Sequence, residues 1–145
     1  MKRLLTILLL SQFNHATEII KEGQEYPIEK LKEQNQQIIK MAVEELSKSL
    51  PQTVDKYTTI TNVRDENLTL IYTFEINTGA KSDEAIKKED KSRMKEAITK
   101  GVCQSSKRFL EAGINLTYEY FSASSKKELF SFHITPPKCK DLDHD

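Results

Sequence analysis

Apolar residues recur with a helical period between residues 27 and 50, and the opposite face carries Lys, Glu and Gln. Pro27 suits the first turn of a helix, where its missing N–H is not needed, and Pro51 ends the pattern. The predicted core-facing residues are Ile28, Leu31, Ile38, Ala42, Leu46 and Leu50, widened by Ile39 and Val43. Asn35 interrupts this face. The pattern predicts one long amphipathic helix.

Two segments with strand periodicity follow this helix. Residues 57–63 are rich in Thr, and residues 68–76 alternate between apolar and polar side chains. The apolar side of the second segment consists of Leu68, Leu70, Tyr72, Phe74 and Ile76. A period of two with one apolar face is typical of a half-buried antiparallel strand. We therefore expect a hairpin with its loop at residues 64–67.

A second, highly charged helix is expected to begin at Ser82 or Asp83, because both residue types cap helices well. Its modest apolar stripe consists of Ile86, Met94, Ala97, Ile98 and Val102. Ser105 or Ser106 is then expected to cap a short helix at residues 107–112. Gly113 ends that helix.

The last hairpin has the clearest pattern. Its apolar face consists of Ile114, Leu116, Tyr118 and Tyr120 and, across a polar loop at residues 122–127, Phe130, Phe132 and Ile134. Together these elements predict one α+β domain over residues 27–140, in the order α-β-β-α-β-β. We expect a four-stranded antiparallel sheet made of two hairpins, with helices on its apolar face and the other face exposed to solvent.

The first residues have the pattern of an export signal. Lys2 and Arg3 precede a short apolar run at residues 4–10, and a polar segment then leads to Ala16. The apolar run is far shorter than the roughly 20 residues that span a bilayer as a helix. We expect a signal peptide at residues 1–16 and a flexible segment at residues 17–26. The chain ends in an acidic tail at residues 141–145.

Charge argues against a nucleic-acid partner. Basic and acidic residues number 22 each, and removal of the leader would take two basic residues and no acid. The mature chain would then carry a slight excess of acid, with no basic field to attract nucleic acid or an anionic membrane. The remaining sequence contains no segment apolar enough to cross a membrane.

The two cysteines are expected to form a disulfide, because a Cys pair in an exported chain is best explained in that way. Cys103 follows the charged helix and Cys139 follows the last strand, so a bridge would join the two. In the chain-entropy model a loop of this length is worth roughly 4 kcal/mol. The alternatives are a catalytic thiol at Cys103 served by His133, and a metal site that includes His144. Both alternatives explain the presence of two cysteines less well than a disulfide does.

No catalytic, cofactor-binding or metal-binding motif stands out. A glycine-rich phosphate loop, a nucleophile elbow and a zinc-protease motif are all missing from the sequence. The acidic residues mostly alternate with lysines, as on a solvated helix face. We therefore predict no enzyme activity, no cofactor and no metal.

Two groups of aromatic and apolar residues remain open to a binding role. Tyr72, Tyr118 and Tyr120 suit core packing, or else the lining of a ligand cavity. Phe121 and Leu129 break the polar outer face of the last hairpin, so they are candidates for an exposed partner patch, or else they cover the loop.

Several motifs together resemble small exported proteins of Gram-negative bacteria. They are residues 50–55 (LPQTVD), 70–74 (LIYTF), 109–113 (FLEAG), 118–120 (YEY) and 134–139 (ITPPKC), with Cys103 before the third. The layout is also similar to one class of type II secretion pilotins. That resemblance implies a helix-backed sheet with a disulfide. Pilotins of this class are lipid-anchored and bind a C-terminal segment of the outer-membrane secretin, whereas this chain has no Cys near its leader.

These observations favour a non-enzymatic exported protein, periplasmic or secreted from a Gram-negative bacterium, that binds another periplasmic or envelope protein. Free sheet edges and helix–sheet grooves would offer docking sites. Two alternatives remain. One is an enzyme or small-ligand carrier with a dispersed site, and the other is a secreted effector or inhibitor.

Overall fold

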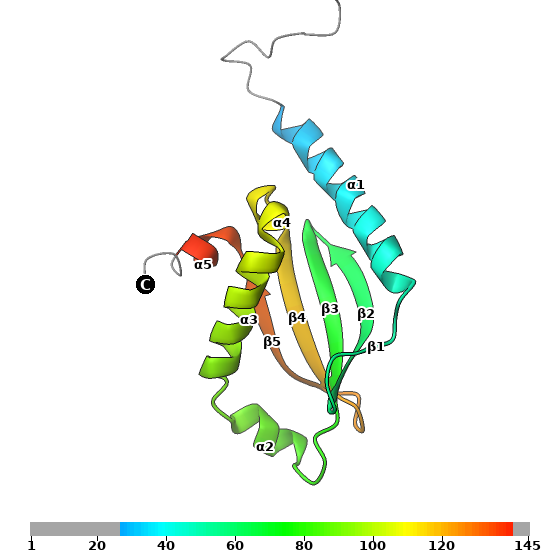
Figure 1. The fold of residues 1–145 in the computed structure, drawn as a ribbon, viewed down its shortest axis with the longest axis vertical. Helices are drawn as coiled ribbons and strands as arrows, with labels where there is room; N and C mark the ends of the chain where they lie inside the picture. Colours follow the sequence, from blue (N-terminus) through cyan, green and yellow to red (C-terminus); the bar gives the residue numbers. More distant parts are fainter. Residues whose placement is uncertain (1–26, 141–145) are drawn as a thin grey trace, which may run out of the picture.

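The computed structural model describes residues 27–140. The expected signal peptide at residues 1–16, the flexible segment at 17–26 and the acidic tail at 141–145 lie outside this range. The elements are, in order, α1 (Ile28–Ser47), β1 (Gln52–Thr53), β2 (Thr58–Glu66), β3 (Thr69–Ile76), α2 (Asp83–Lys88), α3 (Ser92–Ser105), α4 (Lys107–Glu111), β4 (Asn115–Ser122), β5 (Glu128–Ile134) and α5 (Pro136–Lys140) (Figure 1).

The α+β class is confirmed, but the prediction of four antiparallel strands is wrong. The sheet has five strands in the order β1-β2-β3-β4-β5, and its central pair, β3 and β4, is parallel. The reason lies in the connection between the two hairpins. It carries α2, α3 and α4 back along the sheet, so β4 starts at the same end as β3 and runs in the same direction (Figure 1).

The additional strand β1 is a two-residue edge strand that pairs antiparallel with β2. The intervening turn is organised by Asp55, whose Oδ1 accepts hydrogen bonds from the N–H groups of Tyr57 (2.8 Å) and Thr58 (2.9 Å). These bonds hold the pKa of the Asp55 carboxyl below its usual value, with the Tyr57 N–H as the largest cause. The sequence analysis did not predict β1, because two residues are too few to show a period.

The first hairpin is tighter than expected. β2 extends to Glu66, and only Asn67 and Leu68 form the turn, with φ angles of 45° and 58°. Positive φ at both central residues is the conformation that best matches the twist of two paired strands. Leu68 therefore belongs to the turn and not to the strand, although its side chain still packs against the core.

The sheet face that the helices cover confirms the predicted alternation. Strand register aligns its side chains in three rows: Ile60, Phe74, Tyr120 and Phe130; Val63, Tyr72, Tyr118 and Phe132; and Leu70, Leu116 and Ile134. Helices from two parts of the chain cover these rows on the same sheet face. Ile39 of α1 packs over Val63 and Leu70, and Val102 of α3 packs into the aromatic cluster. Burying such apolar surface is the main stabilising term in a domain of this size.

The opposite sheet face is polar, as expected. Its clearest feature is an ion pair that crosses the central strand: the two terminal nitrogens of Arg64 on β2 lie 2.9 Å from the carboxylate oxygens of Glu119 on β4. The Glu119 carboxylate raises the pKa of Arg64. Two parallel hydrogen bonds fix the relative position of both side chains.

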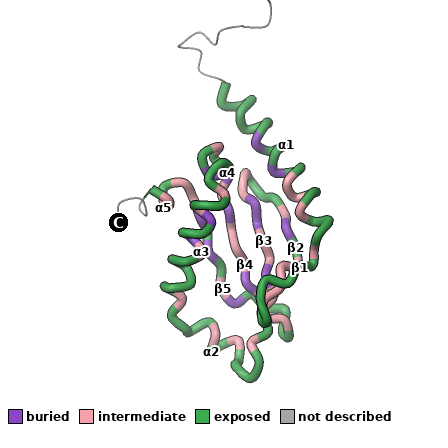
Figure 2. The backbone as a smooth tube through the Cα atoms, in the orientation of Figure 1, coloured by how far each residue is buried: buried purple, intermediate pink, exposed green. Residues whose placement is uncertain are grey.

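Helix α1 differs from its prediction in the face that it buries. Asn35, expected to interrupt the apolar face, is its buried centre with 5% exposure, and its Nδ2 donates a 2.6 Å hydrogen bond to the carbonyl oxygen of Ala112. Ile39 is likewise buried at 1%. Ile28 and Leu31 precede this contact and are exposed, because the first turns of α1 extend past the sheet (Figures 1 and 2).

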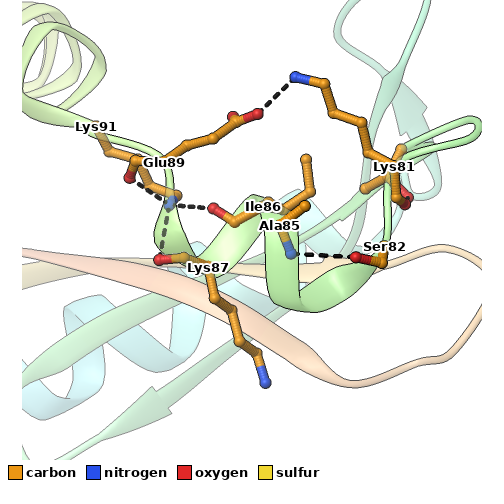
Figure 3. Close-up of polar contacts among 8 residues, drawn as sticks. Lys81, Ser82, Ala85, Ile86, Lys87, Glu89 and Lys91 are labelled. Carbon is orange, nitrogen blue, oxygen red and sulfur yellow. Dashed lines mark hydrogen bonds and ion pairs between the residues drawn. The ribbon is translucent and has the colours of Figure 1, made fainter.

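The expected long second helix is divided into α2 and α3. Ser82 caps α2 as predicted, its Oγ accepting the N–H of Ala85 at 3.2 Å (Figure 3). Glu89 then leaves the helical conformation. Asp90 accepts the N–H of Ser92 at 2.9 Å and so begins α3. The Ser92 hydroxyl also donates to this carboxylate, and its hydrogen bond and that of the N–H together lower the pKa of Asp90.

Lys91 holds this break in place. Its Nζ donates to the carbonyl oxygens of Ile86 (2.5 Å) and Glu89 (3.0 Å) at the end of α2 (Figure 3). The same ammonium group lies 4.8 Å from the centroid of the Phe130 ring on β5. Carbonyls at a helix end have no partner within the helix, so a cation there satisfies them. Lys91 thereby attaches the crossover to the sheet edge.

The expected short helix after Cys103 is α4, and Gly113 ends it with a φ of 87°, as predicted. Ser106 occupies the position before the helix, but its side chain makes no capping hydrogen bond. The capping prediction is therefore wrong.

We predict that Asn35→Ala lowers the free energy of unfolding by about 2 kcal/mol, because it removes a buried donor from a partly buried carbonyl. Urea denaturation measures this as a lower midpoint at an unchanged slope. Gln36→Ala, at an exposed neighbouring position, is the matched control. Equal midpoints for the two variants would contradict the role of Asn35 as the centre of the buried face.

We predict that Lys91→Met lowers the free energy of unfolding by about 1–2 kcal/mol, since two charge-assisted hydrogen bonds and a cation–π contact are lost. Lys95→Met, on an exposed position of α3, should change it little. Amide hydrogen exchange should show faster opening of α2 in the Lys91 variant. Unchanged exchange in α2 would show that Lys91 does not hold the break.

Candidate functional site

The predicted disulfide is confirmed. Cys103 near the end of α3 and Cys139 in α5 are bonded, with their Cα atoms 5.5 Å apart. α5 follows the last strand directly, so the bond joins the crossover to the end of the sheet. The alternative of a catalytic thiol is wrong, because Cys103 is bonded and His133 lies on the polar outer face, with its Nδ1 2.7 Å from the Thr117 hydroxyl.

The hypothetical partner patch on the last hairpin is only partly at the surface. Leu129 is 6% exposed, and Phe121 is half-buried. A register shift next to Phe121 places both residues at an irregular point of the strand pair, which explains why they break the polar alternation. Of the two residues, only Phe121 therefore has a side chain that a partner could contact. A binding role for this patch stays a prediction.

The three tyrosines pack as core residues. The rings of Tyr72 and Tyr118 lie edge to face at 5.2 Å, and Phe74 stacks on Tyr120 at 4.7 Å. Burial raises the pKa of the Tyr118 phenol to about 12 and raises that of Tyr72 as well. Both hydroxyls therefore stay protonated at neutral pH. Tyr72 and Tyr118 keep part of their surface exposed at the middle of the sheet.

A row of exposed apolar side chains lies on α1, and the sequence pattern did not predict its exposure. Leu31, Ile38 and Met41 are 45%, 45% and 69% exposed, and their spacing of seven and three places them on one side of the helix. Ile28 at the helix start is 68% exposed. We call Leu31, Ile38 and Met41 the open stripe of α1. It runs beside the stripe that α1 buries against the sheet.

A signal for the open stripe was present in the sequence. The apolar arc of residues 27–50 is wider than one contact face requires, and it has a polar residue, Asn35, within it. A wide arc is typical of a helix that meets more than one surface. Leu31 and Ile38 were predicted to face the core together with the buried stripe, because a period alone does not show how far a sheet reaches along a helix.

Within residues 27–140, no three or more His, Cys, Asp or Glu side chains gather as a metal site would require. Nor does this range contain a helix with the length and apolarity needed to span a bilayer.

Comparison with known proteins places the sequence in a family. A family model described as a domain of unknown function (DUF8479) matches residues 33–130, from the second turn of α1 to the last strand. The chain belongs to the DUF8479 family. No curated protein matches it significantly in sequence.

Three solved structures share the fold of this DUF8479 domain. A candidate secreted protein from Pseudomonas aeruginosa (PA3611) has a TM-score of 0.66 at 14% identity, over 75% of this chain and 96% of that one. EpsS, a pilotin of the Vibrio vulnificus type 2 secretion system, has a TM-score of 0.63 at 12% identity, over 77% of this chain and 96% of that one. AspS, the type II secretion pilotin of Vibrio cholerae, has a TM-score of 0.60 at 15% identity, over 77% of this chain and 98% of that one. At these identities the likeness shows a shared fold, as the resemblance implied.

We predict that Cys103→Ser/Cys139→Ser lowers the free energy of unfolding of the DUF8479 domain by about 4 kcal/mol, the chain-entropy value for a loop of this length. Urea denaturation of the variant and of the oxidised wild type measures the difference. Added reductant should shift the wild-type midpoint to that of the variant and leave the variant unchanged. A wild type insensitive to reductant at equilibrium would contradict the prediction.

Proposed function

We propose that this protein is a non-enzymatic accessory protein of the Gram-negative envelope, which binds a segment of another envelope protein as a pilotin binds its secretin. The observation that carries the proposal is the open stripe of α1. Three large apolar side chains stand at the surface of a helix whose other apolar stripe is already packed. Contiguous exposed apolar surface of this kind is typical of interaction sites.

The disulfide supports an extracytoplasmic location. Such bonds persist in the periplasm and outside the cell and are rare in the reducing cytosol. We propose that residues 1–16 direct export and are removed. The likeness in fold to two pilotins and a candidate secreted protein is consistent with this location.

An amphipathic helix is the partner segment that best fits the open stripe. Leu31, Ile38 and Met41 follow the helix axis of α1, so a second helix lying along it would meet all three. Docking of a helix through its apolar face is a common mode of peptide recognition. The unbranched Met41 can adapt to partners of different shape.

We propose that the protein meets its partner either in the periplasm or after release from the cell, since disulfides persist in both places. Fractionation of periplasm and medium separates these two destinations.

We predict that Leu31→Asp/Met41→Asp reduces capture of the envelope partner by about tenfold or more, because two desolvated contacts are replaced by charges. The tagged mature protein is incubated with a periplasmic extract, and the captured protein is identified and quantified by mass spectrometry. Gln36→Asp introduces a charge at an exposed polar position on another side of α1 and is the control.

Equal capture by the stripe variant and the control would overturn the proposed surface. Phe121→Asp then tests the hairpin patch as the remaining candidate. Circular dichroism and the urea midpoint show that each variant is folded, so that a loss of capture reports on the surface itself.

A further inference from the structure

A cavity of about 440 Å³ lies beside the disulfide, between α3, α4 and α5. This volume falls within the range of small-molecule sites. α3, α4 and α5 supply its lining, whereas the open stripe belongs to α1, so the cavity is separate from the proposed partner surface. The DUF8479 family description and the fold likenesses assign nothing to it.

The cavity combines an apolar lining with a basic rim. Its apolar part consists of Leu110, Pro136 and the disulfide, and Leu110 is 3% exposed. Its basic part consists of Lys100, Lys107 and Lys140, which come from α3, α4 and α5 in turn. Three separate helices therefore each contribute one lysine to the lining.

Among residues 27–140, the positive charge at the rim has little compensation. Glu111 is the acidic residue in the lining, and its Oε1 lies 3.7 Å from the Lys107 Nζ, a long contact between two well-exposed side chains. Such exposed pairs contribute little. Within the same range, Lys100 and Lys140 make no ion pair. An anionic ligand at the rim would therefore have no carboxylate of residues 27–140 to displace from these two lysines.

We infer that this cavity is a binding site for a small anionic amphiphile, a molecule with one carboxylate or similar head and a compact apolar body. The head would lie between Lys100 and Lys140, where charge-assisted hydrogen bonds are available. The apolar body would cover Pro136 and the disulfide, which are only half-buried, and remove their apolar surface from water. A cation of the same shape would meet the same apolar surface but an unfavourable rim.

The site depends on the disulfide. α5 contributes Pro136 and Lys140 to the lining, and Cys139 ties α5 to Cys103 of α3. Reduction would release this short helix and remove one side of the cavity. Ligand binding is therefore coupled to oxidation, and the ligand in turn stabilises the oxidised, folded chain.

Isothermal titration calorimetry with dodecanoate below its micelle concentration tests the inference. Dodecyltrimethylammonium, with the same chain and the opposite charge, is the matched ligand, and acetate supplies the head alone. We expect saturable binding of dodecanoate at one site per chain, at least about tenfold weaker binding of the cation, and none of acetate at ~1 mM.

Variants locate the site. Lys100→Gln/Lys140→Gln should weaken dodecanoate binding by about tenfold, whereas Lys95→Gln on the exposed part of α3 should leave it unchanged. Reduced wild type should bind as weakly as the double lysine variant. The Lys variants keep the disulfide and the core, so they remain folded.

Any of three results would overturn the inference: equal binding of the two amphiphiles, full binding by Lys100→Gln/Lys140→Gln, or no dodecanoate binding at ~1 mM. The stripe variant Leu31→Asp/Met41→Asp should bind dodecanoate like the wild type. Failure of the partner proposal and failure of this one are therefore separate outcomes.

Discussion

The parallel pairing of β3 with β4 is the contact on which the rest of this structure depends. It joins two hairpins, each of which would be marginal alone, into one sheet. It also aligns the apolar rows, so that Tyr72 lies beside Tyr118 and Phe74 beside Tyr120. A shift of one residue would turn one hairpin's apolar side to solvent. The core exists because the two central strands share this register.

Parallel pairing imposes a crossover, and the crossover shapes the surface. The chain must return from the end of β3 to the start of β4, and it does so through the helices α2, α3 and α4, which lie over β4 and β5. Lys91 attaches the break between α2 and α3 to Phe130, and Cys103 attaches α3 to α5. The cavity beside the disulfide is therefore a consequence of how the crossover is anchored.

Helix α1 stands apart from this arrangement. It covers β2 and β3 on the same sheet face whose β4 and β5 half the crossover covers, and Asn35 connects it to the segment before β4 through Ala112. Its buried stripe completes the core, and its open stripe remains at the surface. The two candidate surfaces thus arise from different parts of the fold: an apolar helix face that suits a partner segment, and a basic-rimmed cavity that suits a small anion with an apolar body.

The sequence by itself determined the α+β class, the faces of β3, β4 and β5, and the Cys103–Cys139 bond, because these depend on local period and on cysteine count. Only the tertiary structure decided the direction of β4 against β3, the edge strand β1 and the half of α1 that is buried. Strand direction depends on where a long connection returns, and the exposure of Leu31 or Ile38 depends on where the sheet ends beneath the helix. Neither is a property of the residues' own spacing. Asn35 illustrates the difference: its polarity marked it as an interruption, whereas a carbonyl distant in sequence made it the centre of a packed face.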